Sequence, residues 1–210
     1  MKGFVAVLWG MLLLLMPFAA CHAQDSELFA LKNRWEYITT QTPENKRADA
    51  LGELAEDAKA LAKTYPNNAR VLVWQGIVLA SQARAKGGVG ALGLAKEARA
   101  SLEQAIRLDP QGNVGSAYVT LGALYDRVPG WPLGFGDDDQ AERMFEKALR
   151  IRPAGIDVNY YYAVFLQDEG RLAEARQHAR RAVEGEARAG RETSDEALRQ
   201  EARRLLREFE

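Results

Sequence analysis

Residues 141–153, AERMFEKALRIRP, carry the pattern that decides the fold: alanines at the first and eighth positions, a bulky apolar residue at the fifth and a proline at the thirteenth. Residues 98–110, ARASLEQAIRLDP, repeat the whole pattern, and residues 175–182, ARQHARRA, repeat its alanines. Small residues let two helices approach closely, and a proline ends the helix before it. The pattern therefore predicts repeated pairs of packed helices. A degenerate earlier copy consists of Leu54, Ala58, Leu61 and Pro66.

Each full copy is preceded by the matching half of a first helix, in which a bulky residue stands near a small one. These halves are Gly76 with Leu79, Tyr118-x2-Leu121-Gly122-x2-Tyr125, and Tyr162-Ala163-x2-Leu166. Together the two halves resemble the tetratricopeptide repeat, a helical hairpin with a period of about 34 residues. The resemblance implies an all-α solenoid of about four hairpins and a C-terminal capping helix, a fold that binds other molecules rather than transforming them.

Hydrophobic periodicity places the helices of these hairpins. The predicted pairs are 26–40 with 43–65, 67–86 with 91–108, 114–127 with 137–151, and 155–168 with 171–184. After a polar break at Gly190, residues 194–209 form an amphipathic helix. Because a terminal repeat leaves a hydrophobic flank exposed, we expect this helix to be the cap. Its apolar face consists of Leu198, Leu205, Leu206 and Phe209.

The repeat spacing indicates two insertions, both in the turn between the helices of a hairpin. One is rich in glycine and lies near 86–95, and the other lies near 128–137. Equivalent turns of stacked repeats lie on the same edge, so the two insertions are expected to be neighbours. The glycines lack the spacing of a phosphate-binding loop, and we expect them to supply unusual backbone angles instead.

The N-terminus has the pattern of a secretory signal peptide over residues 1–23, with Lys2 before a short apolar run and small residues before Gln24. Cleavage there would give a soluble periplasmic or secreted protein with one domain over 24–210. An alternative is a lipoprotein, since Phe18-Ala19-Ala20-Cys21 is similar to a lipobox and lipidation of Cys21 would anchor the chain to a membrane. An uncleaved anchor is a third interpretation.

Composition and chemistry favour no catalytic function. The formal net charge is −1 and no basic tract suggests nucleic acid, while the single cysteine excludes an internal disulfide. His178 has no partner motif around it, and we expect no catalytic residue, cofactor or metal. The acids Asp137, Asp138 and Asp139 lack the alternating spacing of a calcium loop. We expect them to cap a helix, with metal binding as the alternative.

Two candidate binding surfaces remain. The first is the loop insertion, because Trp131 and Phe135 are large aromatics in an irregular segment; they either pack against the scaffold or contact a guest. The second is the concave face that first helices line in the repeat family. Position by position, the resemblance places there Val73, Ile77, Val119, Ala123, Asp126, Tyr160 and Val164. That surface suits an apolar ligand or peptide, or the chain's own segments folding inward.

The motif Val128-Pro-Gly-Trp-Pro-Leu-Gly-Phe-Gly-Asp137, with the glycine-rich insertion one repeat earlier, resembles bacterial envelope tetratricopeptide proteins named after the TatT component of TRAP transporters. The resemblance covers about residues 45–187. It implies a periplasmic adaptor that docks a protein partner, such as a solute-binding subunit, and passes on an apolar or organic-acid ligand. The alternative is a structural envelope scaffold that self-associates as a homo-oligomer and has no small-molecule ligand.

Overall fold

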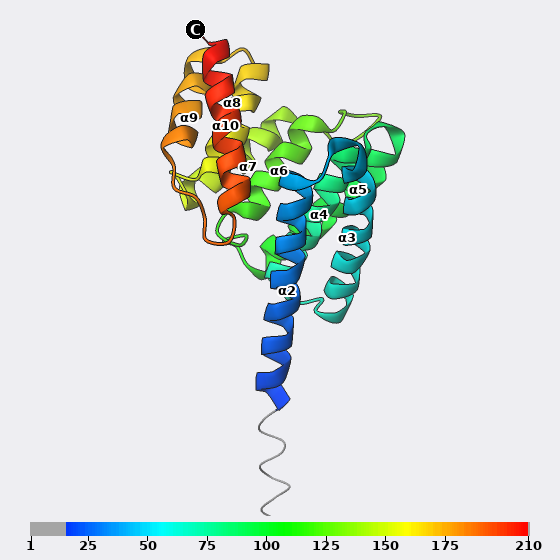
Figure 1. The fold of residues 1–210 in the computed structure, drawn as a ribbon. Coiled ribbons are helices and arrows are strands. Elements are labelled where there is room, and N and C mark those ends of the chain that lie inside the picture. Colours follow the sequence, from blue (N-terminus) through cyan, green and yellow to red (C-terminus); the bar gives the residue numbers. More distant parts are fainter. Residues whose placement is uncertain (1–15, 210) are drawn as a thin grey trace, which may run out of the picture.

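The computed structural model describes the backbone of residues 16–209 and the side chains of residues 24–209. Within this range the chain forms nine helices, and Figure 1 shows that they build the whole fold. They are α2 (Met16–Gln41), α3 (Glu44–Thr64), α4 (Ala69–Lys86), α5 (Gly88–Leu108), α6 (Ser116–Arg127), α7 (Asp138–Ile151), α8 (Ile156–Asp168), α9 (Leu172–Glu184) and α10 (Glu192–Glu208). The predicted all-α fold is confirmed.

Consecutive helices pack as antiparallel hairpins, α2 with α3, α4 with α5, α6 with α7 and α8 with α9. Successive hairpins pack on one another chiefly where the second helix of one meets the first helix of the next: α3 with α4, α5 with α6 and α7 with α8. The last helix, α10, packs on α8 and α9 as expected of a cap, and it also contacts α2 from the first hairpin. Figure 1 shows α10 between the last hairpin and α2, so the two ends of the stack are joined.

The small residues of the repeat lie where paired helices come closest. The Gly76 backbone in α4 faces the Leu102 side chain of α5, and the Gly122 backbone in α6 faces the Phe145 ring of α7. In the last hairpin, Ala163 and Ala179 belong to one buried cluster. Phe145 is fully buried against these neighbours. The alternation of small and bulky residues therefore sets the spacing of the helices within each hairpin.

The structure corrects the prediction of a loop insertion near 86–95. Helix α4 ends at Lys86 and α5 begins at Gly88, so a single residue separates them. The surplus residues extend both helices, which have 18 and 21 residues, whereas α8 and α9 have 13 each. Gly87 and Gly88 have φ angles of 61° and 63°, which glycine adopts without strain. The sharp reversal at these two glycines lets the helices continue to the turn.

The N-terminal helix is also longer than predicted, because α2 begins at Met16 rather than Ser26 and crosses the expected cleavage position. Residues 1–15 of the expected signal peptide, and the side chain of Cys21, lie outside the described part of the chain. Cleavage and lipidation therefore stay predictions. Between residues 16 and 209, no helix combines the length and the hydropathy that crossing a bilayer requires.

Replacing Gly122 by alanine is expected to lower the free energy of unfolding by about 1–3 kcal/mol, because the new Cβ would lie 2.7 Å from the Phe145 ring. The matched control is Gly93→Ala in α5, where a Cβ meets nothing within 4 Å. This control should be neutral or stabilising by up to about 1 kcal/mol, since alanine favours helix. Urea denaturation measures both changes. Equal stability of the two variants would contradict the close-approach role of Gly122.

Candidate functional site

The loop 128–137, which we call the Trp131 loop, has a backbone held by its own hydrogen bonds. The amides of Gly134 and Gly136 donate to the carbonyls of Gly130 and Pro129, each at 3.0 Å. The loop closes where the amide of Asp137 donates to the carbonyl of Tyr125 at 3.0 Å. A side chain at Gly134 or Gly136 would collide with the opposite backbone of the loop. The glycines therefore allow a tight, hydrogen-bonded loop rather than a flexible one.

The two aromatic residues of this loop have opposite environments. The Phe135 ring packs edge-on against Tyr125, with ring centroids 5.7 Å apart, and the Arg99 guanidinium of α5 lies 4.5 Å from its centroid. Trp131 is 89% exposed and Leu133 is 73% exposed. Phe135 thus anchors the loop to the scaffold, whereas Trp131 and Leu133 project from it into solvent.

The seven positions expected to line one concave groove do not form an open surface. Val73 and Ile77 lie in the main core with residues of α2 and α3, and Val119 is buried against α7 and α8. Val164 packs with α10 residues. The other three, Ala123, Asp126 and Tyr160, are partly buried. These positions therefore pack against neighbouring helices in the described structure, and a role for them in binding stays a prediction.

Partial burial changes the pKa of both Asp126 and Tyr160. The Asp126 carboxylate accepts a hydrogen bond of 2.7 Å from Arg127, but burial raises its pKa. Burial also raises the pKa of Tyr160, whose ring lies 5.2 Å from that of Tyr161.

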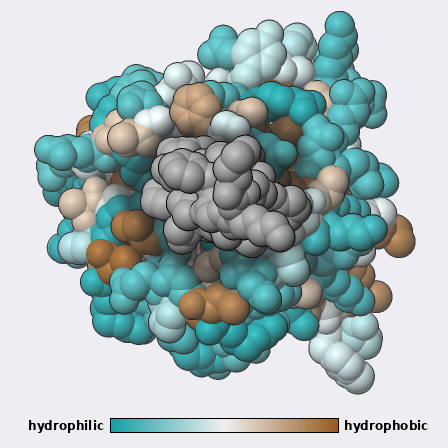
Figure 2. Space-filling view, turned by 90° about the horizontal axis from the view of Figure 1, so that it is seen from below, coloured by the Kyte–Doolittle hydropathy of each residue, from teal (hydrophilic) through white to brown (hydrophobic). Residues whose placement is uncertain are grey.

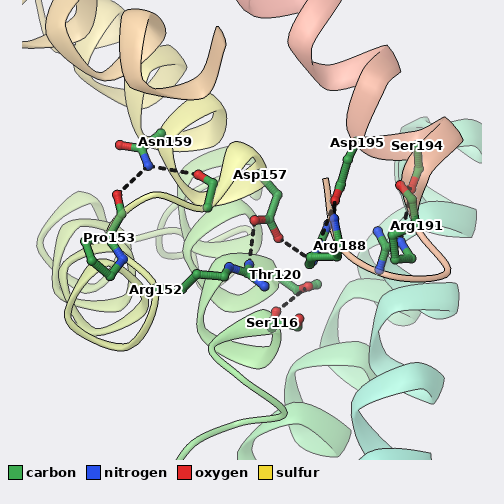
Figure 3. A network of polar contacts seen from close by, with 11 residues as sticks. Ser116, Thr120, Arg152, Pro153, Asp157, Asn159, Arg188, Arg191, Ser194 and Asp195 are labelled. Carbon is green, nitrogen blue, oxygen red and sulfur yellow. Dashed lines mark hydrogen bonds and ion pairs between the residues drawn. The ribbon is translucent and has the colours of Figure 1, made fainter. Parts of the chain in front are cut away.

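Residues 185–195, which we call the strap, comprise the connection between α9 and α10 and the first four residues of α10, and they link the last hairpin to the first. The Ser194 amide donates to the Glu36 carboxylate of α2 at 2.8 Å. Arg188 bridges Asp157 of α8 at 2.8 Å and Asp195 of α10 at 2.5 Å. Figure 3 shows Asp157 between Arg152 and Arg188, with Asp195 beyond Arg188. The strap is therefore held by charged groups at both ends of the stack.

Asp157 is the centre of this network. One carboxylate oxygen accepts from Arg152 at 2.5 Å and the other accepts from Arg188. Burial alone would favour the neutral acid, but the two guanidinium groups outweigh it and hold the pKa of Asp157 below its ordinary value. Arg188 in turn has its pKa raised: burial opposes its charge, and the carboxylates of Asp157 and Asp195 overcome that effect. Asp157 and Arg188 are therefore both charged at neutral pH.

Arg191 occupies a different environment from Arg188. Its guanidinium carbon lies 4.5 Å from the ring centroid of Trp35 and 5.1 Å from that of Trp74. The two indoles meet edge to face, with centroids 5.7 Å apart. Burial and then the charge of Arg188 lower the pKa of Arg191 to about 10, so it stays protonated at neutral pH. Its Nε donates to Ser194 Oγ at 3.0 Å.

Sequence reasoning missed the strap and its receptors. Arg188 and Arg191 lie in a stretch that composition marks only as a polar break, and the helices that receive them from outside the strap lie far away in the chain. Asp157 is 31 positions from Arg188, and Glu36 is 158 positions from Ser194. One feature of the sequence could have indicated this site. Trp35 and Trp74 are two tryptophans on predicted helices of successive hairpins, and such rings can receive a cation.

The single histidine of the described side chains has a structural environment. Asn159 donates its amide to the carbonyls of Pro153 and Gly155, each at 2.8 Å, so its Oδ1 accepts from His178 Nδ1 at 2.8 Å. The His178 ring also packs against Tyr162, with centroids 4.8 Å apart. Burial, and then the charge of Arg181, lower the pKa of His178 to about 4. The neutral ring joins α9 to α8.

The acidic triplet lies where helix α7 begins. Asp137 Oδ1 accepts from the Gln140 amide at 2.9 Å, which confirms the predicted helix cap. Within residues 24–209, no three His, Cys, Asp or Glu side chains lie in an arrangement that suits a metal ion.

Two shallow hollows on the surface of the described chain have volumes of about 260 Å³ each. One lies between α5, α6 and α7, with a floor that includes Ile106, Leu121 and Met144 and a rim that includes Arg107 and Lys147. The other lies between α2 and the start of α10. Figure 2 shows the face seen from the start of α2: outside the area covered in grey it is mainly hydrophilic, with small separate apolar patches.

Comparisons with known proteins identify one short segment. A family model described as the tetratricopeptide repeat matches residues 90–111, which lie in α5 and the turn after it. Among solved structures, a crystal structure of MamA is similar, with 17% sequence identity and a TM-score of 0.48 over 79% of this chain and 90% of that chain. No curated protein matches the sequence at a significant level.

Acid is expected to destabilise the protein through His178. Because its folded pKa of about 4 is below the unfolded value of about 6.5, the unfolded chain binds a proton that the folded chain excludes. This contribution to stability is complete above pH 6.5 and is lost as the pH falls towards 4, with a slope of up to about 1.4 kcal/mol per pH unit. Urea denaturation at several pH values measures the slope. His178→Gln should flatten it between pH 6.5 and 4, and an unchanged slope would contradict the assignment.

Proposed function

We propose that this protein is a binding or adaptor protein that engages a protein partner through the Trp131 loop. The observation that carries the proposal is the exposure of Trp131 and Leu133 on a loop whose backbone is already ordered by hydrogen bonds. Exposed large apolar side chains gain free energy when a partner covers them, and tryptophan is enriched among residues that dominate interface energies. An ordered loop also loses little conformational entropy on binding.

A protein partner fits this surface better than a small ligand does. Small-molecule sites are concave and enclose most of the ligand, whereas the hollows of the described surface are shallow and the Trp131 loop is convex. A projecting indole suits insertion into a pocket of a partner. The tetratricopeptide match over residues 90–111 supports the same class of function, since stacked helical hairpins offer extended surfaces for binding.

The cell envelope is the proposed location. The apolar N-terminal run and the small residues before Gln24 support export to the periplasm or secretion, and Cys21 supports lipid anchoring as the alternative. The loop motif Val128–Asp137 supports, by its resemblance to TatT-like proteins, a narrower proposal: the partner is a periplasmic solute-binding subunit. An organic-acid or apolar solute would then pass at that interface.

Self-association is a second candidate function, favoured by one specific observation. Val89 is 95% exposed at the turn of the α4 and α5 hairpin, which is the equivalent turn to the one that carries Trp131. Apolar residues exposed at two equivalent turns would also suit a contact between copies of this chain. In that case the protein is an envelope scaffold and the Trp131 loop contacts a second protomer.

Trp131→Ala is expected to leave the free energy of unfolding within about 0.5 kcal/mol of the parent, since the side chain touches solvent. Partner affinity should fall by about 2 kcal/mol or more, roughly 30-fold, if the indole is the anchor. Leu172→Ala, which removes an exposed apolar side chain from α9, is the matched control and should bind like the parent.

The measurement is native mass spectrometry of the tagged chain isolated from its own envelope, followed by titration of each variant with the partner identified. A photoreactive residue at position 133 should crosslink to the same partner. Capture that is equal for the parent and Trp131→Ala would contradict the proposed role of the loop. Sedimentation of the purified protein separates the two candidates, because self-association predicts an oligomer that Trp131→Ala dissociates.

A further inference from the structure

The strap is held in place by polar contacts, unlike the rest of α10. Its only apolar side chains are Ala187 and Ala189, and both are exposed. Further along α10, Ala202 and Leu205 are buried, and Leu205 packs with Ala163 and Ala179 of the last hairpin. Hydrophobic burial therefore holds α10 on the last hairpin, and the side chains of the strap add none to it.

Two arginines of the strap act as its anchors, and each is received by groups from distant helices. The Arg188 guanidinium binds the Asp157 carboxylate of α8 at 2.8 Å. The Arg191 guanidinium lies over the rings of Trp35 in α2 and Trp74 in α4. Glu36 of α2 accepts a strap amide at 2.8 Å. We call these residues, Trp35, Glu36, Trp74 and Asp157, the floor. Asp157 binds the Arg188 guanidinium, and the two indoles contact the Arg191 guanidinium.

The place between the two rings is suited to a guanidinium, whereas the Lys32 ammonium lies over Trp74 alone, 5.7 Å from its centroid. A guanidinium is planar, stacks on aromatic faces and is weakly hydrated, whereas a lysine ammonium is compact and strongly hydrated. Within residues 24–209 no carboxylate forms an ion pair with Arg191, so the two rings and Ser194 are its contacts. Recognition of the second arginine therefore depends on the shape of the group as well as its charge.

The way the strap is bound makes it exchangeable. A buried ion pair gains little net free energy over solvated ions, because desolvation offsets the attraction. Such contacts select a partner by geometry without holding it strongly. Segments with few buried apolar contacts open locally while the rest of the fold remains intact. The connecting part of the strap has few buried apolar contacts, and Leu205 holds α10 on the last hairpin independently of it.

We propose that Trp35, Glu36, Trp74 and Asp157 form a binding site for extended segments that carry two arginines three residues apart, and that the strap is its resting, autoinhibitory occupant. A partner segment with the pattern Arg-x-x-Arg displaces Arg188 and Arg191 and binds the same floor. This site lies on α2, α4 and α8 and is separate from the Trp131 loop. An experiment that refutes this site therefore leaves the proposed function of the Trp131 loop untouched, and the reverse also holds.

The test uses a fluorescent peptide with the sequence of residues 185–196, GEARAGRETSDE, and the full chain. The parent should bind it weakly, since its tethered strap competes at a high effective concentration. The double variant Arg188→Ser with Arg191→Ser should bind it at least tenfold more tightly. A peptide with lysine at both arginine positions should lose at least tenfold of that affinity. Fluorescence anisotropy measures all three.

Two results would overturn the proposal: a double variant that retains its helical circular dichroism but binds no better than the parent, or a lysine peptide that binds as well as the arginine peptide. Hydrogen exchange of the parent decides the question without any variant. The strap amides of Arg188 and Ser194 donate to carboxylates. They should exchange at least tenfold faster than the amides inside α8. Exchange of both sets at one common rate would show that the strap opens only with global unfolding, and would refute an exchangeable occupant.

Discussion

Phe145 lies with its ring against the backbone of Gly122, and the hairpin before it repeats the arrangement with Leu102 against Gly76. This close approach of one helix to another is the contact on which the stack depends. It sets the distance between the two helices of a hairpin. That distance in turn fixes where the next hairpin can pack. Without the small residue, the bulky one would force the pair apart and the next hairpin would lose its packing surface.

The two insertions show how a regular stack acquires individual features. The first is absorbed into longer helices, and two glycines with positive φ make the reversal at residues 87–88. The second remains a loop, because Pro129 and Pro132 disfavour helix and the glycines permit a tight crossing of its own backbone. Phe135 fixes this loop to the scaffold, so that Trp131 is presented in a defined place. Rigidity and exposure together make it a suitable contact for a partner.

The C-terminal segment combines two kinds of interaction. Leu205 and its neighbours close the last hairpin by hydrophobic burial, which is strong and unspecific. Arg188 ties the strap to Asp157 of the last hairpin by ion pairing, and Arg191 ties it to Trp35 of the first hairpin by stacking. The first kind keeps the fold intact. The second kind fixes the position of the strap through charged and aromatic groups. In the proposed site, a partner segment with the same groups takes the place of the strap.

The sequence by itself determined the class of fold, the pairing of helices and most helix boundaries, because a hairpin is a local structure and the spacing of Ala141, Phe145 and Ala148 reports its period directly. It also determined the cap at Asp137, which involves residues three apart. Only the tertiary structure decided that Val73 and Val119 are buried, that Phe135 anchors while Trp131 projects, and that Arg191 meets Trp35 and Trp74. These outcomes depend on how the stack curves and brings its two ends together, and that curvature is the sum of many packing contacts that no local pattern encodes.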